Sequence, residues 1–140
     1  MSEILIDHVL LDRVTKAAKE SLRLRMNYNF HESLSSPSQR LLNALEPGTV
    51  LPIHRHRHTA ETYVLLRGRM RVLFYDDDKK EINRYELDPA EGTYGVNIPR
   101  GQWHTIEVLC AGTVIFEVKD GPYIPCLLYT SPSPRDRQKS

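Results

Sequence analysis

The chain has 140 residues, which is enough for one domain with a single hydrophobic core and too few to expect two. Its 19 Lys and Arg residues nearly balance its 18 Asp and Glu residues, so the charge gives no reason to expect nucleic acid as a partner. No apolar run approaches the roughly 18 residues of a membrane span, and the two cysteines cannot build a disulfide framework, so we expect a cytoplasmic protein without membrane partners.

The first predicted element is a helix over about residues 7–23. Its apolar positions recur on one face of a 3.6-residue period, and they are Leu11, Val14, Ala18 and Leu22. Asp7 is suited to cap the N-terminus of this helix. Residues 26–38 lose the period and are rich in Ser and Asn, which predicts loop and extended chain. We therefore assign residues 1–38 to an N-terminal helix and lead-in.

From residue 39 onward the pattern is that of short strands separated by turns with Gly or Pro. The predicted strands are 39–45, 61–66, 70–74, 81–87, 95–99, 103–109 and 113–119. Alternation turns Met70, Val72 and Phe74 inward and Leu73 outward, and it turns Tyr85 and Leu87 inward on the following strand. Many short strands predict an all-β antiparallel sandwich or barrel over residues 39–125.

Residues 126–140 differ abruptly in composition from the rest of the chain. They read CLLYTSPSPRDRQKS, and one interpretation is a disordered polar tail. The stretch CLLYTSPSPRD also resembles the conceptual translation of a sequencing adapter that was read through at the end of a fragment. We favour this second interpretation, in which the segment is not native and the natural sequence differs after about Pro125.

Four residues have the types and spacing that suit a divalent metal ion. His54 and His56 are two apart, so on a strand their imidazoles share one face, and Glu61 follows after room for a bend. His104 lies near the start of a later strand. Three imidazoles and one carboxylate suit one ion of Zn, Fe, Mn, Ni or Cu. Each residue alone has an ordinary structural explanation, and His58 is a competing ligand that we expect to be exposed instead.

The spacing of the whole set resembles that of the cupin proteins. Gly48 to Gly68 follows the first cupin motif, Gly-x5-His-x-His-x4-Glu-x6-Gly, and Pro99-Arg-Gly-Gln-Trp-His104 follows the core of the second. The resemblance implies a small single-domain jelly-roll barrel with a metal at the four residues above. Two departures exist: the glycine that opens the second motif is displaced, and Val108 stands where the motif has Asn. Neither position is a metal ligand.

Further segments are similar to one cupin family, WbuC. They include Asn29-Phe30-His31, Arg71-Val-Leu-Phe-Tyr-Asp-Asp77 and Glu117-Val-Lys-Asp-Gly-Pro-Tyr123, and the likeness covers nearly all of residues 4–125. Members of that family are small bacterial cupin-fold metalloproteins found with genes for surface polysaccharide (O-antigen) synthesis, and their reaction is not established. The resemblance implies a small-molecule ligand, with a sugar or sugar-derived molecule as the candidate.

Three functions remain open at this point. A bound metal acting as a Lewis acid suits isomerisation or epimerisation of a sugar. A non-enzymatic metal- or sugar-binding module ranks level with it, and a metal-dependent dioxygenase ranks below both. Whether the protein is an enzyme is therefore left undecided.

Three more residues are candidates for contact with the substrate. Alternation from Glu61 turns Tyr63 inward, where its hydroxyl is a candidate catalytic acid, although a buried strand tyrosine is the alternative. His31 and Arg40 are candidate substrate-binding residues from the N-terminal segment, which is placed to cover the mouth of the barrel. Arg40 is suited to hold a carboxylate or phosphate, although an exposed arginine is the commoner case. Because a small jelly roll has sheet edges to protect, we also expect a homodimer.

Overall fold

The structure, a computed structural model, describes residues 2–125 and 127–128. The segment predicted to be a non-native tail therefore lies outside the described residues, except for Leu127 and Leu128. The elements are α1 (His8–Glu20), β1 (Arg25–Asn29), β2 (Ser38–Leu45), β3 (His54–Arg55), β4 (Glu61–Arg67), β5 (Met70–Tyr75), β6 (Glu81–Leu87), the 3-10 helix η1 (Pro89–Glu91), β7 (Gly95–Ile98), β8 (Trp103–Val108), β9 (Thr113–Asp120) and β10 (Leu127–Leu128).

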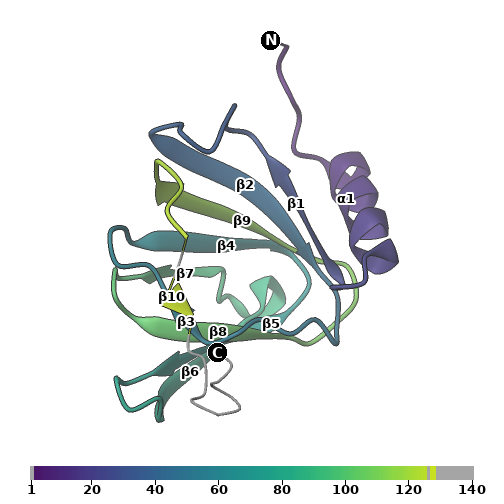
Figure 1. The fold of residues 1–140 in the computed structure, drawn as a ribbon. Coiled ribbons are helices and arrows are strands. Elements are labelled where there is room, and N and C mark those ends of the chain that lie inside the picture. Colours follow the sequence, from purple (N-terminus) through teal and green to yellow (C-terminus); the bar gives the residue numbers. More distant parts are fainter. Residues whose placement is uncertain (1, 126, 129–140) are drawn as a thin grey trace.

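The strands form two antiparallel sheets that face each other (Figure 1). One has the order β1-β2-β9-β4-β7, and the other has the order β10-β3-β8-β5-β6. This arrangement confirms the all-β jelly roll with an N-terminal helix. No strand pairing among the described residues joins one sheet to the other, so the jelly roll is an open two-sheet sandwich with sheet edges, as expected.

Helix α1 packs on the outer face of the first sheet, beside β1 and β2 (Figure 1). The Asp7 carboxylate accepts a hydrogen bond from the backbone N–H of Leu10, which confirms the predicted cap. The prediction for Leu22 was wrong, because Ser21 adopts extended backbone and ends the helix, leaving Leu22 fully exposed. None of the helices among the described residues has the length and apolar character to cross a membrane.

Strand β1 lies where the sequence predicted loop and extended chain. Its inward-facing residues are polar, namely Arg25, Asn27 and Asn29, because they border a cavity and not the core. Tyr28, on the other face, packs against the cluster under the helix. A strand with a polar inner face lacks the apolar alternation by which strands are recognised, so this strand could not be predicted from the pattern of apolar residues.

The hydrophobic core fills the space between the sheets at one end of the sandwich. Its fully buried members include Met70, Val72 and Leu87, as alternation predicted. Leu73 was assigned outward but is buried, since Arg84 and Thr105 flank it on the neighbouring strands. Tyr85 was assigned inward but is half exposed, because β6 is the edge strand of its sheet and is incompletely covered.

The turn between β4 and β5 generates the first testable prediction. Gly68 has a φ of +97°, and a Cβ added there would lie 2.6 Å from the Thr113 Cα. Gly68→Ala should therefore lower the free energy of unfolding by about 2–4 kcal/mol, from strain and overlap together. Urea unfolding followed by Trp103 fluorescence measures the loss.

Gly92→Ala is the matched control for this change. Gly92 has a similar φ of +87°, but nothing lies within 4 Å of an added Cβ. Backbone strain alone should cost about 1 kcal/mol there. Equal losses in the two variants would contradict the close approach of the β4–β5 turn to Thr113.

Candidate metal centre

Two histidines face each other across neighbouring strands of the second sheet. His54 in β3 and His104 in β8 are cross-strand partners, so their side chains stand on the same face. Their ring centroids are 4.3 Å apart, and His104 is almost fully buried at 1% exposure. The predicted pair, fifty residues apart in sequence, is thus brought into contact by the β3–β8 pairing.

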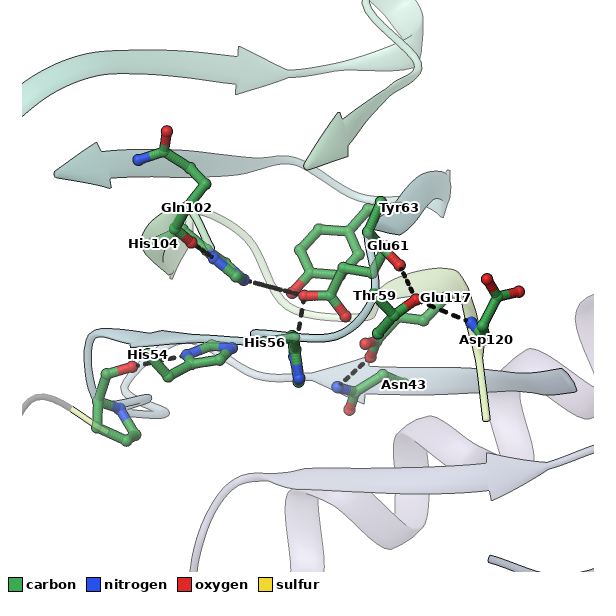
Figure 2. A network of polar contacts seen from close by, with 12 residues as sticks. Asn43, His54, His56, Thr59, Glu61, Tyr63, Gln102, His104, Glu117 and Asp120 are labelled. Atoms are coloured by element: carbon green, nitrogen blue, oxygen red, sulfur yellow. Dashed lines mark hydrogen bonds and ion pairs between the residues drawn. The ribbon is translucent and has the colours of Figure 1, made fainter. Parts of the chain in front are cut away.

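Glu61 reaches this pair from the opposite sheet, where it opens β4 (Figure 2). It is 2% exposed, and its Oε1 lies 3.0 Å from His104 Nε2 and 3.4 Å from His56 Nε2. The Tyr63 hydroxyl donates a hydrogen bond to the same oxygen over 3.0 Å. One carboxylate oxygen is therefore in contact with side chains from both sheets.

Three of the four predicted ligands gather at one place, and the fourth, His56, lies beside them. Potential ligand atoms of His54, Glu61 and His104 all lie within 4.8 Å of one another. His56, in the turn after β3, joins them through Glu61, and its ring centroid is 5.5 Å from that of His54. His58 is exposed, in line with the choice of His54 and His56 over it.

Backbone carbonyls fix which imidazole nitrogens point into the site. His54 Nδ1 lies 2.9 Å from the carbonyl oxygen of Pro52, and His104 Nδ1 lies 2.8 Å from that of Gln102. A carbonyl only accepts, so each Nδ1 carries the proton and donates it. In the neutral tautomer, Nε2 of each ring then presents a lone pair, which is the form that binds metal ions.

The electrostatics of the site favour a carboxylate and a neutral His54. Burial alone would raise the pKa of Glu61. Contacts of its carboxyl with the His104 and His56 rings, which are hydrogen bonds only when the facing nitrogen carries a proton, outweigh burial and hold that pKa well below its usual range. Burial first, and the neighbouring His104 second, lower the pKa of His54 to about 4. An anionic oxygen beside imidazole nitrogens is a donor set that fits a divalent first-row ion.

The site opens into a cavity of about 550 Å³ between the sheets. His54, His56, Glu61 and Tyr63 line its inner end. The wall formed by β1, β2 and β9 is largely polar, and its polar lining residues include Arg25, Asn27, Asn29, Gln39, Asn43, Glu117 and Lys119. The cavity is large enough for a small organic ligand beside the candidate metal centre.

The three candidate substrate residues lie in different surroundings. Tyr63 is buried, and its hydroxyl is 3.0 Å from Glu61 Oε1 and 3.4 Å from His104 Nε2. His31 lines the cavity, and its Nδ1 accepts a hydrogen bond from the backbone N–H of Arg40. The Arg40 side chain is exposed and is not among the residues that line the cavity.

The sequence analysis missed a buried polar pair in the cavity wall. Glu117 in β9 is 8% exposed, and Asn43 Nδ2 in β2 donates a hydrogen bond to its Oε2 over 2.9 Å. Burial, and then the nearby Glu61, raise the pKa of Glu117 to about 7. Alternation places Glu117 on the same face as Ile115, but both faces of β9 are covered, so alternation did not mark this carboxyl as inward.

Trp103 and Arg55 flank the histidines from outside the cavity. Trp103 precedes His104, and its ring lies between the Arg55 guanidinium, 4.4 Å from the centroid, and the Lys79 ammonium, 4.5 Å from it. Arg55 itself lies between His54 and His56 in the chain. This cation–π stack ties the short strand β3 to β8 next to the candidate ligands.

The sequence matches one family model, described as a domain of unknown function, DUF6016, over residues 6–87. That match covers more than half of the chain. The chain belongs to the DUF6016 family. The matched region of this DUF6016 protein includes His54, His56 and Glu61 and ends before His104. No curated protein matches the sequence.

Solved structures that share the fold of this DUF6016 protein are cupin proteins. An oxalate decarboxylase has a TM-score of 0.57 and 19% identity, with coverage of 75% of this chain and 27% of that one. KdgF from Halomonas sp. has a TM-score of 0.57 and 13% identity, with coverage of 71% and 80%. The capsular polysaccharide assembling protein CapF from Staphylococcus aureus has a TM-score of 0.55 and 21% identity, with coverage of 83% and 31%.

These similarities establish the cupin fold for the DUF6016 chain. They leave the reaction open, because the identities are low and the chain spans about a quarter of the oxalate decarboxylase and under a third of CapF. KdgF is closer in length, with 80% of its chain covered.

The buried Glu117 generates a prediction about pH. Its folded-state pKa of about 7 lies above its ordinary value of 4.5, so between these values the folded state binds more protons than the unfolded state. Stability that depends on this proton is complete below pH 4.5 and is lost as the pH rises through 7. Glu117→Gln removes the titration, so its stability relative to the unmodified protein should rise by roughly 3 kcal/mol from pH 4.5 to 8.

Urea unfolding of both chelator-treated proteins across this pH range measures the effect. Taking the difference between them cancels the groups that they share, including His54, whose lowered pKa acts in the opposite direction. A difference that stays constant over the whole range would show that Glu117 titrates normally.

Proposed function

We propose that the protein is a metal-binding cupin that holds one divalent ion with His54, His56, Glu61 and His104. The observation that carries the proposal is the orientation of His104. Its Nδ1 donates to a backbone carbonyl, while its Nε2 faces an ionised carboxylate oxygen at 3.0 Å. Two lone pairs do not face each other at this distance without a proton or another cation between them.

A metal ion is the cation that we propose for this position. Protonation would place an imidazolium in a position with 1% exposure. A divalent ion would instead be shared by the other donors around it, His54 and His56. When bound, it would act as a Lewis acid that polarises a ligand oxygen. Its identity among Zn, Fe, Mn, Ni and Cu depends on supply and affinity together.

The cavity favours a ligand-binding site over a purely structural metal site. A structural site is closed by its protein ligands and surrounded by packed side chains. Here three of the four candidate ligands, His54, His56 and Glu61, line a space of about 550 Å³. Tyr63 is positioned at the inner end of that space as a candidate acid, and His31 is a candidate contact for the ligand. Arg40 stays a weaker candidate, because it is exposed on the other face of β2.

The substrate that we propose is a sugar or sugar-derived molecule of surface polysaccharide synthesis. The resemblance to the WbuC family supports this class, and so does the shared fold of a protein described as assembling capsular polysaccharide. Isomerisation or epimerisation is the reaction class that a Lewis acid beside a tyrosine hydroxyl suits. A binding module without catalysis is the alternative. We also propose that the protein forms a homodimer and acts in the cytoplasm.

Metal content is the test of the ligand set. The full chain, prepared without added metal, should contain about one equivalent of a divalent metal by inductively coupled plasma mass spectrometry. The His54→Ala/His104→Ala variant should contain almost none after the same preparation, because it lacks two of the three imidazole ligands.

His58→Ala is the matched control, since His58 is exposed and lies two residues from His56. It should keep the full equivalent. Stoichiometric metal in the double variant would overturn the ligand set. A folded unmodified protein that takes up none of the five ions on reconstitution would overturn the proposal as a whole.

A further inference from the structure

Asn43 and Glu117 lie side by side on the inner face of the first sheet. They belong to the paired strands β2 and β9, and the Asn43 amide donates to the Glu117 carboxyl over 2.9 Å. Both line the cavity that also contains His54 and Glu61. Figure 2 shows the pair on the strand layer below Glu61, with its polar atoms on the side of His56.

This pair is costly as a purely structural feature. Glu117 is 8% exposed and forms no ion pair with any described residue. Tyr63 on β4 and Lys119 along β9 lie on the same face as Glu117. Its other neighbours on that face include Leu41 and Ile115, which are apolar and buried. Burying a carboxyl among such residues is unfavourable, and apolar side chains of similar volume would pack at least as well. The same burial raises the pKa of Glu117, because it disfavours the charged form of the carboxyl.

The Asn43 side chain also has an unsatisfied acceptor. Its Oδ1 is buried and has no hydrogen-bond partner among the described residues. A buried acceptor without a partner costs about 1–3 kcal/mol. An acceptor of this kind beside a carboxyl provides two neighbouring positions that accept hydrogen bonds, which is what the hydroxyl groups of a ligand require.

The charged side chains that line the cavity further restrict the kind of ligand that can bind there. Arg23, Arg25 and Lys119 line it together with the two carboxyls Glu61 and Glu117. Three cations disfavour an amine as the donor that meets Asn43 and Glu117, and they favour a ligand that is neutral or negatively charged. Hydroxyl groups are the remaining common donors.

We propose that Asn43 and Glu117 form a hydroxyl-recognition subsite for a polyhydroxylated, anionic ligand that spans the cavity to the metal centre. The inference rests on the proposed function, because it assigns the anionic end of the ligand to the metal ion. The hydroxyls of the ligand donate to Glu117, and they reach Asn43 Oδ1 by a turn of the Asn43 amide, because that oxygen is enclosed in this structure. Binding thereby satisfies the buried acceptor that has no partner among the described residues.

Two probes that differ in hydroxyls alone test the subsite. D-Gluconate and hexanoate have the same number of carbons and the same carboxylate, but hexanoate has no hydroxyl groups. Titration calorimetry on the zinc-loaded full chain at pH 7.5 should give at least about tenfold tighter binding for gluconate, the equivalent of one net hydrogen bond. Equal affinities for the two probes would overturn the proposal.

The Asn43→Leu/Glu117→Met variant replaces both polar partners with apolar side chains of similar volume. Because it leaves neither partner unpaired, it should fold with an unchanged or higher melting temperature. It should keep its zinc and its affinity for hexanoate, and it should lose the tenfold preference for gluconate. If the variant keeps the preference, the pair has a structural role and the proposal fails.

Asn97→Leu is the matched control, because it makes the same amide-to-leucine change outside the cavity, where Asn97 pairs with Thr62. It should behave like the unmodified protein with both probes. Should the double variant fail to fold, Glu117→Gln replaces it, and the gluconate preference should then fall at least threefold with zinc content unchanged.

Failure of the metal proposal can be told apart from failure of the subsite. Zinc content is measured on every sample, so a missing metal is seen directly. In that case, gluconate is titrated into the metal-free protein and the NMR signals of the Asn43 side-chain amide are followed. Saturable shifts with gluconate and none with hexanoate would support the subsite without the metal. The absence of such shifts would overturn it.

Discussion

The contacts to one buried oxygen, Oε1 of Glu61, hold the two sheets together at the end of the sandwich where the cavity lies. Glu61 comes from one sheet, His104 comes from the other, and His56 comes from the turn that connects them. A carboxylate with 2% exposure is stable only with compensating partners. The spacing of the sheets at this end is therefore set by polar contacts, and the loss of any one partner leaves a buried charge uncompensated.

The two ends of the sandwich differ: a hydrophobic core fills one end, and the cavity occupies the other. At one end Met70, Val72 and Leu87 fill the space between the sheets. At the other end the inner faces of β1, β2 and β9 carry charged and amide side chains that border the cavity. Outside that wall, the helix covers the opposite face of β2 through Leu42 and Ala44. Strand β2 is thus anchored by its outer face, which frees its inner face to carry polar groups without losing the fold.

How much was predictable from sequence differs between the two ends. The motif spacing placed His54, Glu61 and His104 together correctly, because turns and strand alternation fix which residues share a face. Strand β1 was missed because its inner face is polar. Glu117 was missed as a site residue because both faces of β9 are covered, one by the other sheet and one by the helix. Alternation alone then does not say which face a polar residue occupies. The predictions for Leu22 and Tyr85 were wrong for a different reason. Periodicity does not show where a helix ends, and it does not show how much of an edge strand the opposite sheet covers.

The two walls of the cavity also differ in how their chemistry is specified. His54 and His104 each donate Nδ1–H to the carbonyl of the residue two positions earlier, Pro52 and Gln102. Local backbone geometry therefore fixes both tautomers, and no other side chain is needed to orient these ligands. Such a site is robust to substitution around it but selects weakly between metals and ligands. The opposite wall depends on side-chain pairs such as Asn43 and Glu117, where one substitution changes which hydrogen bonds a ligand can make. Under the proposed function, specificity for the ligand would thus be encoded on β2 and β9, and the metal ligands would come from β3, β8, the start of β4 and the turn between β3 and β4.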